Sequence, residues 1–549
     1  MAKLTLVQPS GMPVLGAAED VCDEIGRNAQ VFSSLPAANR HLPRVTCLLA
    51  QSARTFAEKD AIVTPATRLS YRDAFDRMLL LSERLSQLAS PGSRAVIYMR
   101  NCIDAALLPL ALRDAGIVSV PVNWRMSPLE LANVVTASEA ELILHDSYSA
   151  DSVNQALDRL SQPGTRAVLI EQLDLESSVP FSIDVRPNAN EGALASIHFT
   201  SGTLGAPKGV MQNHLNWEVV WRNMMSVRDF RKSDIVALTG PLSHAAGTYV
   251  VPLLLSGSTI MLPDDTSDDA LAGEFDEHGI TVLQCVPTLL TRLVASEAFC
   301  SAARQSLRLI VYGAESMPHA TLRAAVETFG PIVAQNYGLT EAMMTCATLP
   351  PDEHALFSGG KLIELRHGIV GRPYPFVELV IRRADGSPVE GDEIGEITVR
   401  SPHVMLGYWR NPKATAEVLR NGWLWTGDLA RWTADGYLSM AGRSKDMIIC
   451  GGMNIYPAEV QGFLSQIPGV RQCAAFGVPS VTWGEELVAV VVIDDDSPEH
   501  REALRSRARF DLGIRTPKQW IFTEDLPRTS NGKTDFPALR ALARQEAVE

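Results

Sequence analysis

The sequence lacks clustered cysteines and metal-binding histidines. Its eight cysteines are scattered and none forms a C-x-x-C pair, and its eleven histidines contain no H-E-x-x-H motif. A zinc ribbon, an iron–sulfur centre or a disulfide scaffold needs clustered thiols, so the pattern excludes these classes. We expect buried, reduced thiols in a cytoplasmic protein.

An excess of positive charge is also missing. Lys and Arg number 49 against 63 for Asp and Glu, which gives a formal net charge of −14. Because a basic face supplies most of the affinity for nucleic acid, we expect no nucleic-acid partner. Apolar residues make up 46% and charged residues 20% of the chain, proportions that favour a globular protein over a disordered one.

No apolar run is long and continuous enough to predict a membrane span. The stretch between Asp234 and Asp264 contains no charged side chain, but Gly240, Pro241, Pro252 and other breakers interrupt it. A spanning helix needs about 20 mainly apolar residues. We therefore expect a buried strand, a turn and a packed helix here. The first residues carry one Lys and no long apolar core, so we expect no secretory signal.

Short apolar runs alternate with helical patterns over most of the chain. Such buried runs separated by helices are typical of parallel strands in an α/β fold. The predicted strands are 95–99, 118–122, 141–145, 167–170, 195–199, 235–238, 259–262, 281–286 and 307–312, and two of the predicted helices are 104–114 and 321–329.

The pattern changes twice towards the C-terminus. Segments 377–382 and 396–400 flank an Asp-Gly turn and predict antiparallel strands, which we assign to a small β-barrel-like part. Beyond residue 443, a helix at 457–465 and strands at 473–478 and 487–493 suffice for a separate α+β domain of about 100 residues. We predict an N-terminal arm (1–40), a large domain (41–442), a hinge (443–447) and a small domain (448–549).

The strongest chemical signal is a loop rich in hydroxyl groups and glycine at 200–209, directly after a predicted strand. Backbone N–H groups and hydroxyls of such a loop can surround a polyphosphate, and a lysine adds positive charge. It is not a Walker A loop, because Gly209 follows Lys208. The predicted phosphate-binding residues are Thr200, Ser201, Gly202, Thr203, Gly205 and Lys208.

This loop resembles the phosphate loop of the adenylate-forming superfamily of acyl-CoA synthetases, peptide-synthetase adenylation domains and luciferases. Five further segments resemble that family's motifs in the same order, so the resemblance extends over roughly residues 45 to 540. They are the adenine and magnesium motif (335–341), the ribose motif (425–428), the hinge (442–446), the start of the mobile domain (451–457) and the catalytic-lysine loop (527–533).

The resemblance implies two half-reactions. A carboxylate attacks the α-phosphorus of ATP to give an acyl-adenylate and pyrophosphate, and a thiol, usually that of CoA, then displaces AMP. The site must neutralise charge where the two anions meet. Glu341 is expected to bind Mg²⁺, Thr340 an α-phosphate oxygen, and Asp428 the ribose hydroxyls with support from Arg443. The remaining predicted nucleotide contacts are Gly313, Ala314, Glu315, Asn336, Tyr337 and Gly338.

The small domain is expected to rotate between the half-reactions. Lys533 is predicted to bridge the attacking carboxylate and the α-phosphate. Lys445 takes the hinge position, and Gly451 and Gly452 should form the face that meets the pantetheine arm of CoA. Leu204 departs from the family pattern, which usually has a second Thr or Ser in the phosphate loop.

The acyl pocket is expected beside His244, and the resemblance implies a catalytic role for His244 in gating the pocket or close to the carboxylate. No Asp lies in that region to bind a substrate ammonium group, so an apolar or aromatic carboxylic acid fits best. The predicted pocket residues are His244, Ala245, Gly247, Tyr312, Gly338 and Met343.

The resemblance therefore predicts an acid–CoA ligase that uses ATP, Mg²⁺ and CoA, as a monomer or homodimer. Three alternatives remain: an enzyme that loads a separate carrier protein, an adenylating enzyme with another acceptor or another oxyanion, and a non-catalytic nucleotide-binding protein.

Overall fold

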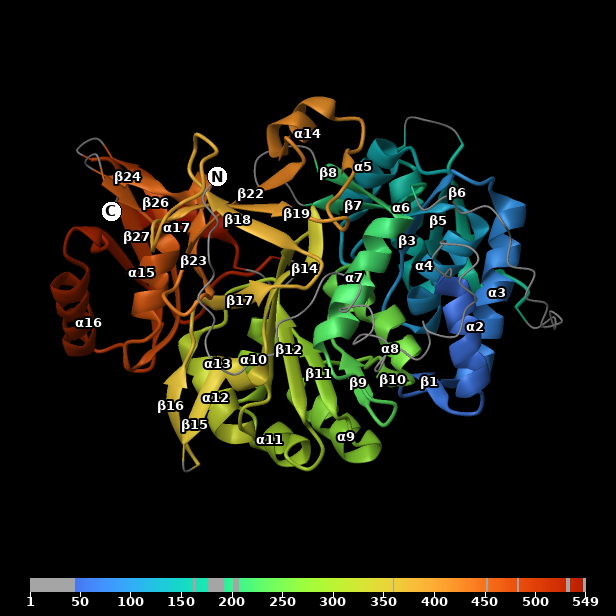
Figure 1. Cartoon of the computed structure of the whole chain (residues 1–549), viewed down its shortest axis with the longest axis horizontal. Helices are drawn as coiled ribbons and strands as arrows, with labels where there is room; N and C mark the ends of the chain where they lie inside the picture. Colours follow the sequence, from blue (N-terminus) through green and yellow to red (C-terminus); the bar gives the residue numbers. More distant parts are fainter. Residues whose placement is uncertain are drawn as a thin grey trace, which may run out of the picture.

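The computed structural model describes most of the chain, from the start of helix α2 (Val45–Thr55) onwards (Figure 1). The described residues are 45–160, 164–175, 192–200, 207–358, 360–450, 453–480, 483–529 and 534–546. They form a mixed α/β fold with a large N-terminal and a small C-terminal domain, as predicted. The predicted arm at 1–40 lies outside the described residues.

A seven-stranded sheet forms one side of the large domain. Its strand order is β20-β8-β7-β4-β3-β5-β6, and β4, β3, β5 and β6 pair in parallel. The five strands predicted at 95–99, 118–122, 141–145, 167–170 and 195–199 are confirmed. The bounds are β3 Arg94–Tyr98, β4 Val118–Pro121, β5 Leu142–His145, β6 Arg166–Leu169, β7 Leu194–Thr200, β8 Lys208–Asn213 and β20 Gly407–Tyr408.

A second, fourteen-stranded sheet has a parallel half and an antiparallel half. Strands β10, β9, β11, β12 and β13 are parallel, and β14, β17, β23, β22, β19 and β18 continue the sheet with antiparallel pairing. The four strands predicted in the parallel half and the antiparallel pair β18–β19 are confirmed. The bounds are β9 Ile235–Leu238, β10 Thr259–Met261, β11 Val282–Cys285, β12 Leu309–Gly313, β13 Val333–Leu339, β14 Ala342–Leu349, β17 Ile369–Pro373, β18 Glu378–Arg382, β19 Gly395–Arg400, β22 Trp423–Trp432 and β23 Leu438–Arg443.

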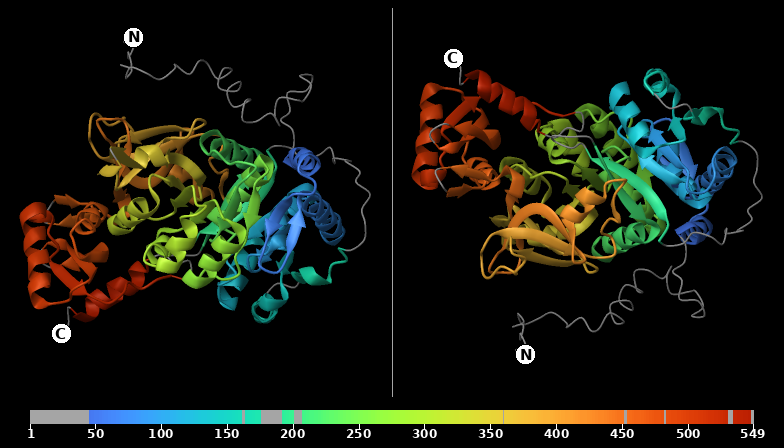
Figure 2. Two further views of the ribbon diagram at one scale, coloured as in Figure 1. Left: turned by 90° about the horizontal axis from the view of Figure 1, so that it is seen from below. Right: turned by 90° about the horizontal axis from the view of Figure 1, so that it is seen from above.

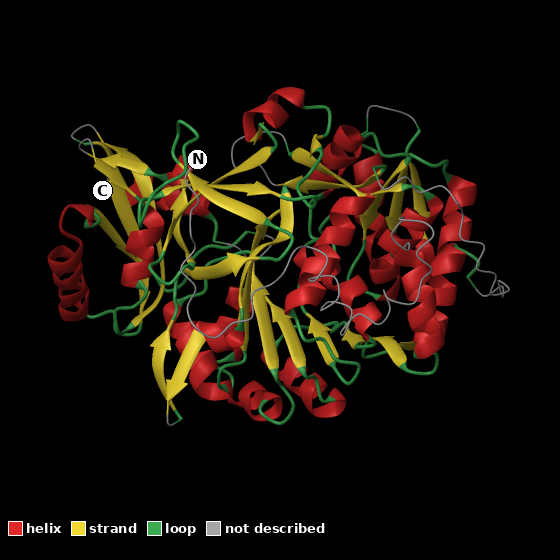
Figure 3. Cartoon of the chain, viewed as in Figure 1, coloured by secondary structure: helices red, strands yellow, loops and turns green. Residues whose placement is uncertain are grey.

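Helices fill the space between the two sheets (Figure 3). One hydrophobic core joins these helices to strands of both sheets, since it contains Ile97 of β3 and Val236 of β9. Burial of their apolar faces on both sides holds the sheets in a fixed relation. The helices are α2 Val45–Thr55, α3 Tyr71–Leu88, α4 Ile103–Ala115, α7 His214–Val227 and α8 Val250–Ser256.

The segment between Asp234 and Asp264 forms β9, the short helix η3 (Ala245–Tyr249), α8 and β10, as expected for buried structure. Gly257 ends α8 with a φ of +80°, a conformation that glycine adopts without strain. Among the residues that the structure describes, no helix combines the length and the apolar character needed to cross a membrane.

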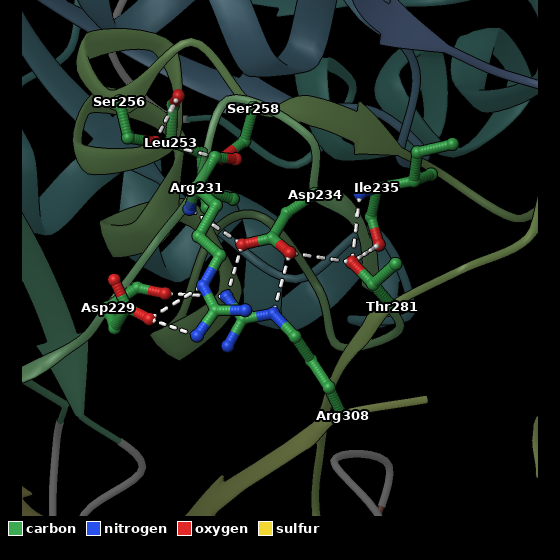
Figure 4. Close-up of polar contacts among 9 residues, drawn as sticks. All are labelled: Asp229, Arg231, Asp234, Ile235, Leu253, Ser256, Ser258, Thr281 and Arg308. Atoms are coloured by element: carbon green, nitrogen blue, oxygen red, sulfur yellow. Dashed lines mark hydrogen bonds and ion pairs between the residues drawn. The ribbon is translucent and has the colours of Figure 1, made fainter. Parts of the chain in front are cut away.

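Asp234 anchors the start of β9 (Figure 4). Arg308 Nε donates to Asp234 Oδ1 at 2.8 Å, and a second Arg308 nitrogen pairs with the other oxygen. The Thr281 hydroxyl and the Arg231 backbone N–H donate to the same carboxylate, at 2.9 and 2.7 Å. Burial alone would raise the pKa of this carboxyl, but the hydrogen bonds outweigh burial and lower the pKa.

The C-terminal domain stands at one end of the molecule (Figure 2). Its sheet has the order β25-β24-β27-β26, with β28 beside β27, and has its own hydrophobic core. The helix predicted at 457–465 and the strands at 473–478 and 487–493 are confirmed. The bounds are β24 Ile448–Cys450, β25 Met453–Ile455, β26 Val470–Ser480, β27 Gly484–Ile493, β28 Gln519–Phe522, α15 Pro457–Leu464, α16 Pro498–Leu512 and α17 Phe536–Glu546.

The cysteines that the structure describes are all free thiols. Most are buried, as expected, whereas Cys47 and Cys102 are only partly buried. Cys22 lies outside the described residues.

Candidate active site

The predicted phosphate loop connects the antiparallel strands β7 and β8. Thr200 and Lys208 are paired at the open end of this ladder, so both stand at the base of the loop. Lys208 Nζ lies 4.9 Å from the ring centre of Tyr408, which is a cation–π distance. Ser201, Gly202, Thr203, Leu204 and Gly205 lie outside the described residues.

Thr340 and Glu341 form the tip of the β13–β14 hairpin. Leu339 and Ala342 pair across it, which leaves these two residues as the turn. Gln212 of β8 donates its side-chain amide to Thr340 O at 3.0 Å, and the Tyr408 hydroxyl donates to Glu341 Oε1 at 2.7 Å. The turn of the large sheet is thus fastened to β8 and β20 of the seven-stranded sheet.

The hairpin tolerates little extra volume. A Cβ at Gly338 would lie 2.6 Å from backbone atoms of Met344. Met344 itself has a φ of +58°, in the left-handed region that costs energy for a side chain. The close approach of the two strands therefore requires glycine at 338.

Asp428 and Arg443 face each other across strands β22 and β23. Arg443 Nε donates to Asp428 Oδ1 at 2.9 Å, and the Tyr337 hydroxyl donates to Asp428 Oδ2 at 2.8 Å. The charge of Asp428, the leading cause, raises the pKa of Arg443. Burial, and then Asp428, raises the pKa of Tyr337. The three residues that we predicted at the ribose and adenine end thus form one hydrogen-bonded group.

Asn336 lies in the core with its amide already engaged. Its Oδ1 accepts from the Tyr374 hydroxyl at 2.6 Å and from Arg228, and its Nδ2 donates to Tyr249 Oη at 2.7 Å. These partners fix the Asn336 side chain from the side of the core. That Asn336 also contacts adenine stays a prediction.

The other predicted adenine residues follow β12. A Cβ at Gly313 would lie 2.7 Å from Asn336 O, so the strand passes close to β13. Ala314 has a φ of +72°, an unfavourable conformation for a residue with a side chain. Strained backbone of this kind occurs where a site fixes the chain direction. Glu315 follows and is partly buried.

Two of the predicted acyl-pocket residues, His244 and Gly247, line one cavity with about 660 Å³ of empty volume, including its opening. Tyr312 and Met343 are buried, and their contact with the acid stays a prediction. The Tyr312 hydroxyl lies 2.8 Å from Gln335 Oε1 and 2.9 Å from His354 Nε2. His244 itself is exposed, with Nδ1 2.8 Å from Ser243 Oγ, and Ala245 is partly buried.

The two domains meet close to the predicted hinge. Lys445 lies in a short 3₁₀ helix, Ser444–Asp446, directly after β23. Glu459 of α15 accepts from Arg431 of β22 at 3.0 Å and from Arg515 at 3.4 Å. The first contact is an ion pair between the domains. Gly451, Gly452 and Lys533 lie outside the described residues.

The residues around Glu341 fit a magnesium ion that also binds phosphate. Among the described residues, no three His, Cys, Asp or Glu side chains gather into a ready-made metal centre. Mg²⁺ in nucleotide sites commonly takes one or two carboxylates, with phosphate and water as its other ligands. Glu341 would supply one such carboxylate, of which only Oε1 has a hydrogen-bond donor within the described part of the chain.

Sequence reasoning missed Tyr408 and Gln212. Both contact the Thr340–Glu341 turn, from positions 67 and 128 residues away along the chain. It also missed the buried Arg228, which bonds Asn336. A polar side chain beside Gly407 or within a strand carries no local signal of such a contact.

The chain matches known proteins over most of its length. The family model of AMP-binding enzymes matches residues 49–409, and the model of the AMP-binding enzyme C-terminal domain matches 459–533. A feruloyl-CoA synthase from an Amycolatopsis species is 35% identical, over 88% of this chain and 95% of that protein. An indoleacetate–CoA ligase from Aromatoleum aromaticum is 31% identical, over 89% of this chain and 96% of that protein.

A solved structure shares the fold of this chain. The amide bond synthetase McbA from Marinactinospora thermotolerans has a TM-score of 0.81 at 29% identity, over 91% of this chain and 99% of that chain.

Proposed function

The chain belongs to the family of AMP-binding enzymes, and from that premise we propose how its site works and which acid it uses. The enzyme is an AMP-forming acid–CoA ligase, with ATP and CoA as substrates. In the first half-reaction the acid's carboxylate attacks the α-phosphorus of ATP, and pyrophosphate leaves. In the second, the thiol of CoA attacks the acyl carbon, a carbon–sulfur bond forms and AMP leaves.

We propose that nucleotide binding rests on two groups of residues. Asp428 would accept hydrogen bonds from the ribose hydroxyls, with its carboxylate already oriented by Arg443 and Tyr337. Thr340 would donate to an α-phosphate oxygen, and Lys208 would add charge at the base of the phosphate loop. The other proposed ATP contacts are Thr200, Ser201, Gly202, Thr203, Gly205, Gly313, Ala314, Glu315, Asn336 and Gly338.

Glu341 would hold Mg²⁺, which when bound neutralises charge on the ATP phosphates. The Tyr408 hydroxyl supports this role, because it donates to one carboxylate oxygen and so fixes the plane of the carboxyl group. Lys533 would bring a second positive charge to the attacking carboxylate.

We further propose that the small domain (448–549) rotates about the hinge (443–447) after adenylation. Lys533 would then leave the site, and the Gly451–Gly452 segment would face the CoA thiol. The Arg431–Glu459 ion pair supports a defined arrangement of the two domains.

The acid that we propose is apolar and aromatic. The single observation that carries this proposal is the cavity beside His244, whose walls include Trp217 and Trp221. Pockets with mainly apolar and aromatic walls and a few polar groups are typical sites for small organic ligands. The names of two relatives, feruloyl-CoA synthase and indoleacetate–CoA ligase, denote acids with an aromatic ring.

AMP release from ATP and Mg²⁺ across a panel of aryl, short, medium and long acids, with and without CoA, tests the proposal. We expect aryl acids to give AMP, and acyl-CoA in the mass spectrum.

Acid-dependent pyrophosphate release that does not depend on CoA would instead assign the adenylate to a carrier protein. An added amine tests another acceptor, for which the structural likeness to the amide bond synthetase McbA gives only weak support. We also propose that the enzyme is a monomer or a homodimer and that it acts in the cytoplasm.

A further inference from the structure

The cavity beside His244 lies between the two sheets of the large domain. Helices α4, α7 and α8 line it together with strands β4 and β7. Strand β7 contributes His198 to the cavity wall and ends at Thr200, where the predicted phosphate loop begins. The cavity therefore borders the strand from which the predicted phosphate loop starts.

Two tryptophans form an aromatic wall. Trp217 and Trp221 lie one turn apart on α7, with ring centres 5.9 Å apart and an interplanar angle of 35°. Trp217 Nε1 donates to Ser196 Oγ at 2.9 Å, which fixes that ring. The His198 ring lies 5.7 Å from Trp217. Flat, fixed rings of this kind favour a flat partner, because aromatic pairs gain energy from offset or tilted packing.

The charged group in the wall is neutralised. Arg113 of α4 donates to Glu218 at 3.1 Å and lies 5.1 Å from the Trp221 ring centre. Burial lowers the pKa of Arg113 to about 10, and the Glu218 charge opposes this shift, so the guanidinium stays charged and paired at neutral pH. Because the Arg113–Glu218 ion pair is neutral overall, it does not attract a second carboxylate on a ligand.

His198 lines the cavity and carries a buried polar atom that has no described partner. Its Nε2 is buried and has no hydrogen-bond partner among the residues that the structure describes. Burial, and then the neighbouring His244, lowers the pKa of His198 to about 3, so the ring is neutral at physiological pH. A neutral imidazole nitrogen either donates or accepts one hydrogen bond, and a buried polar group without a partner is unfavourable.

We propose that this cavity binds the ring of an aryl acid that carries a neutral polar substituent, such as a hydroxyl group, and that His198 Nε2 forms a hydrogen bond with that substituent. The ring packs against Trp217 and Trp221, and the carboxylate points towards His244. This inference rests on the proposed function and adds a specificity-determining residue to it. An acid with a second negative charge is disfavoured in the same cavity.

The test compares acids that differ only in a ring hydroxyl: cinnamate against its ortho-, meta- and para-hydroxy derivatives, with acyl-CoA formation as the readout. We expect the wild-type enzyme to prefer at least one hydroxylated acid by about tenfold or more in kcat/KM, the range of one hydrogen bond. His198→Leu should bring this ratio close to one by slowing the hydroxylated acid alone. His198→Gln, which keeps an amide near the same position, should retain part of the preference.

A matched control is His500→Leu, the same substitution on α16 of the C-terminal domain, which should keep the wild-type ratio. Binding without ATP or CoA gives a second readout, because an acid that packs against the tryptophans should quench fluorescence that Trp217→Phe removes. We expect the hydroxylated acid to quench at lower concentration.

The outcomes separate the two proposals. If acyl-CoA forms but hydroxylated and plain acids react within twofold of each other in the wild-type enzyme, the inference is overturned and the proposed function stands. An unchanged ratio in a folded His198→Leu variant also overturns it. If no acid gives AMP or acyl-CoA, the proposed function fails and the inference fails with it. The wild-type comparison decides the question even where His198→Leu does not fold.

Discussion

The Tyr408 hydroxyl donates a 2.7 Å hydrogen bond to the Glu341 carboxylate. Tyr408 belongs to β20 at the edge of the seven-stranded sheet, and Glu341 lies on a turn of the large sheet. The bond therefore joins the two sheets at the proposed magnesium site. Burial, and then the Glu341 charge, raises the pKa of Tyr408, so the hydroxyl stays a donor at every physiological pH.

Tyr408→Phe should weaken the use of magnesium. The change removes one hydrogen bond and keeps the ring against Lys208. Since a hydrogen bond to a charged group contributes about 1.5 to 3 kcal/mol and water can replace part of it here, we expect adenylation to slow by about five- to tenfold. The Mg²⁺ concentration for half-maximal pyrophosphate release should rise by a similar factor. The exposed Tyr148 provides the matched control Tyr148→Phe, and equal Mg²⁺ curves for both variants would contradict the role of Tyr408.

Breaking the Arg431–Glu459 ion pair should loosen the C-terminal domain. Arg431 belongs to β22 of the large domain and Glu459 to α15 of the small one, at 3.0 Å. Arg431 is partly exposed, so the pair contributes no more than about 1 kcal/mol, which is about a fivefold change in population. We expect Arg431→Glu to speed tryptic cleavage near Lys445 by about two- to fivefold.

The charge swap is the sharper control for that pair. Arg431→Glu combined with Glu459→Arg restores opposite charges and should return cleavage towards the wild-type rate. Arg471→Glu, which disrupts the exposed pair with Asp494 within the small domain, should leave the rate at Lys445 unchanged. Cleavage that stays fast in the double variant would show that the contact does not hold the domains.

Lys533 and Gly452 should affect different half-reactions. Lys533→Ala removes the charge proposed to meet the attacking carboxylate, so adenylation should stop while supplied acyl-adenylate is still converted to acyl-CoA. Gly452→Leu should do the reverse, because a side chain would obstruct the proposed path of the CoA thiol. Pyrophosphate release and thioester formation from synthetic adenylate, measured separately, give the two rates. Equal loss of both in both variants would contradict the rotation.

Buried strands could be predicted from the sequence because the signal is local. The run 95–99 is wholly apolar between Arg94 and Arg100, and the parallel sheet buries both faces of its strand. Leu309–Gly313 is likewise apolar and buried along its whole length. The order of strands and their junction in one fourteen-stranded sheet depend on contacts between distant segments, and no local pattern predicts them.

In the candidate active site, too, only the contacts between residues of recognised motifs could be predicted from the sequence. The pairing of Asp428 with Arg443 joins two residues that the motifs had already identified. The contacts of Tyr408, Gln212 and Arg228 come from other elements, and only the fold brings them to the motifs. Met343, which was predicted in the acyl pocket, is buried in the same hydrophobic core as Trp221 and Leu242 of the cavity wall. That Met343 contacts the acid stays a prediction.

Asp234→Asn should lower stability in a pH-dependent way. The folded protein lowers the pKa of Asp234 below its unfolded value of about 3.9, because Arg308 and two further donors stabilise the charged form. The group therefore stabilises the fold fully above about pH 5, and this contribution is lost as the pH falls through the folded pKa. Since Arg308 is partly exposed, we expect a loss of about 2 kcal/mol in unfolding free energy at pH 7.

Thermal melts from pH 7 to 3.5 should show the difference in melting temperature between Asp234→Asn and the wild-type protein closing below about pH 4. Asp496→Asn, in an exposed pair with Arg501, is the control and should leave the midpoint unchanged; a gap for Asp234→Asn that stays constant to pH 3.5 would contradict the lowered pKa.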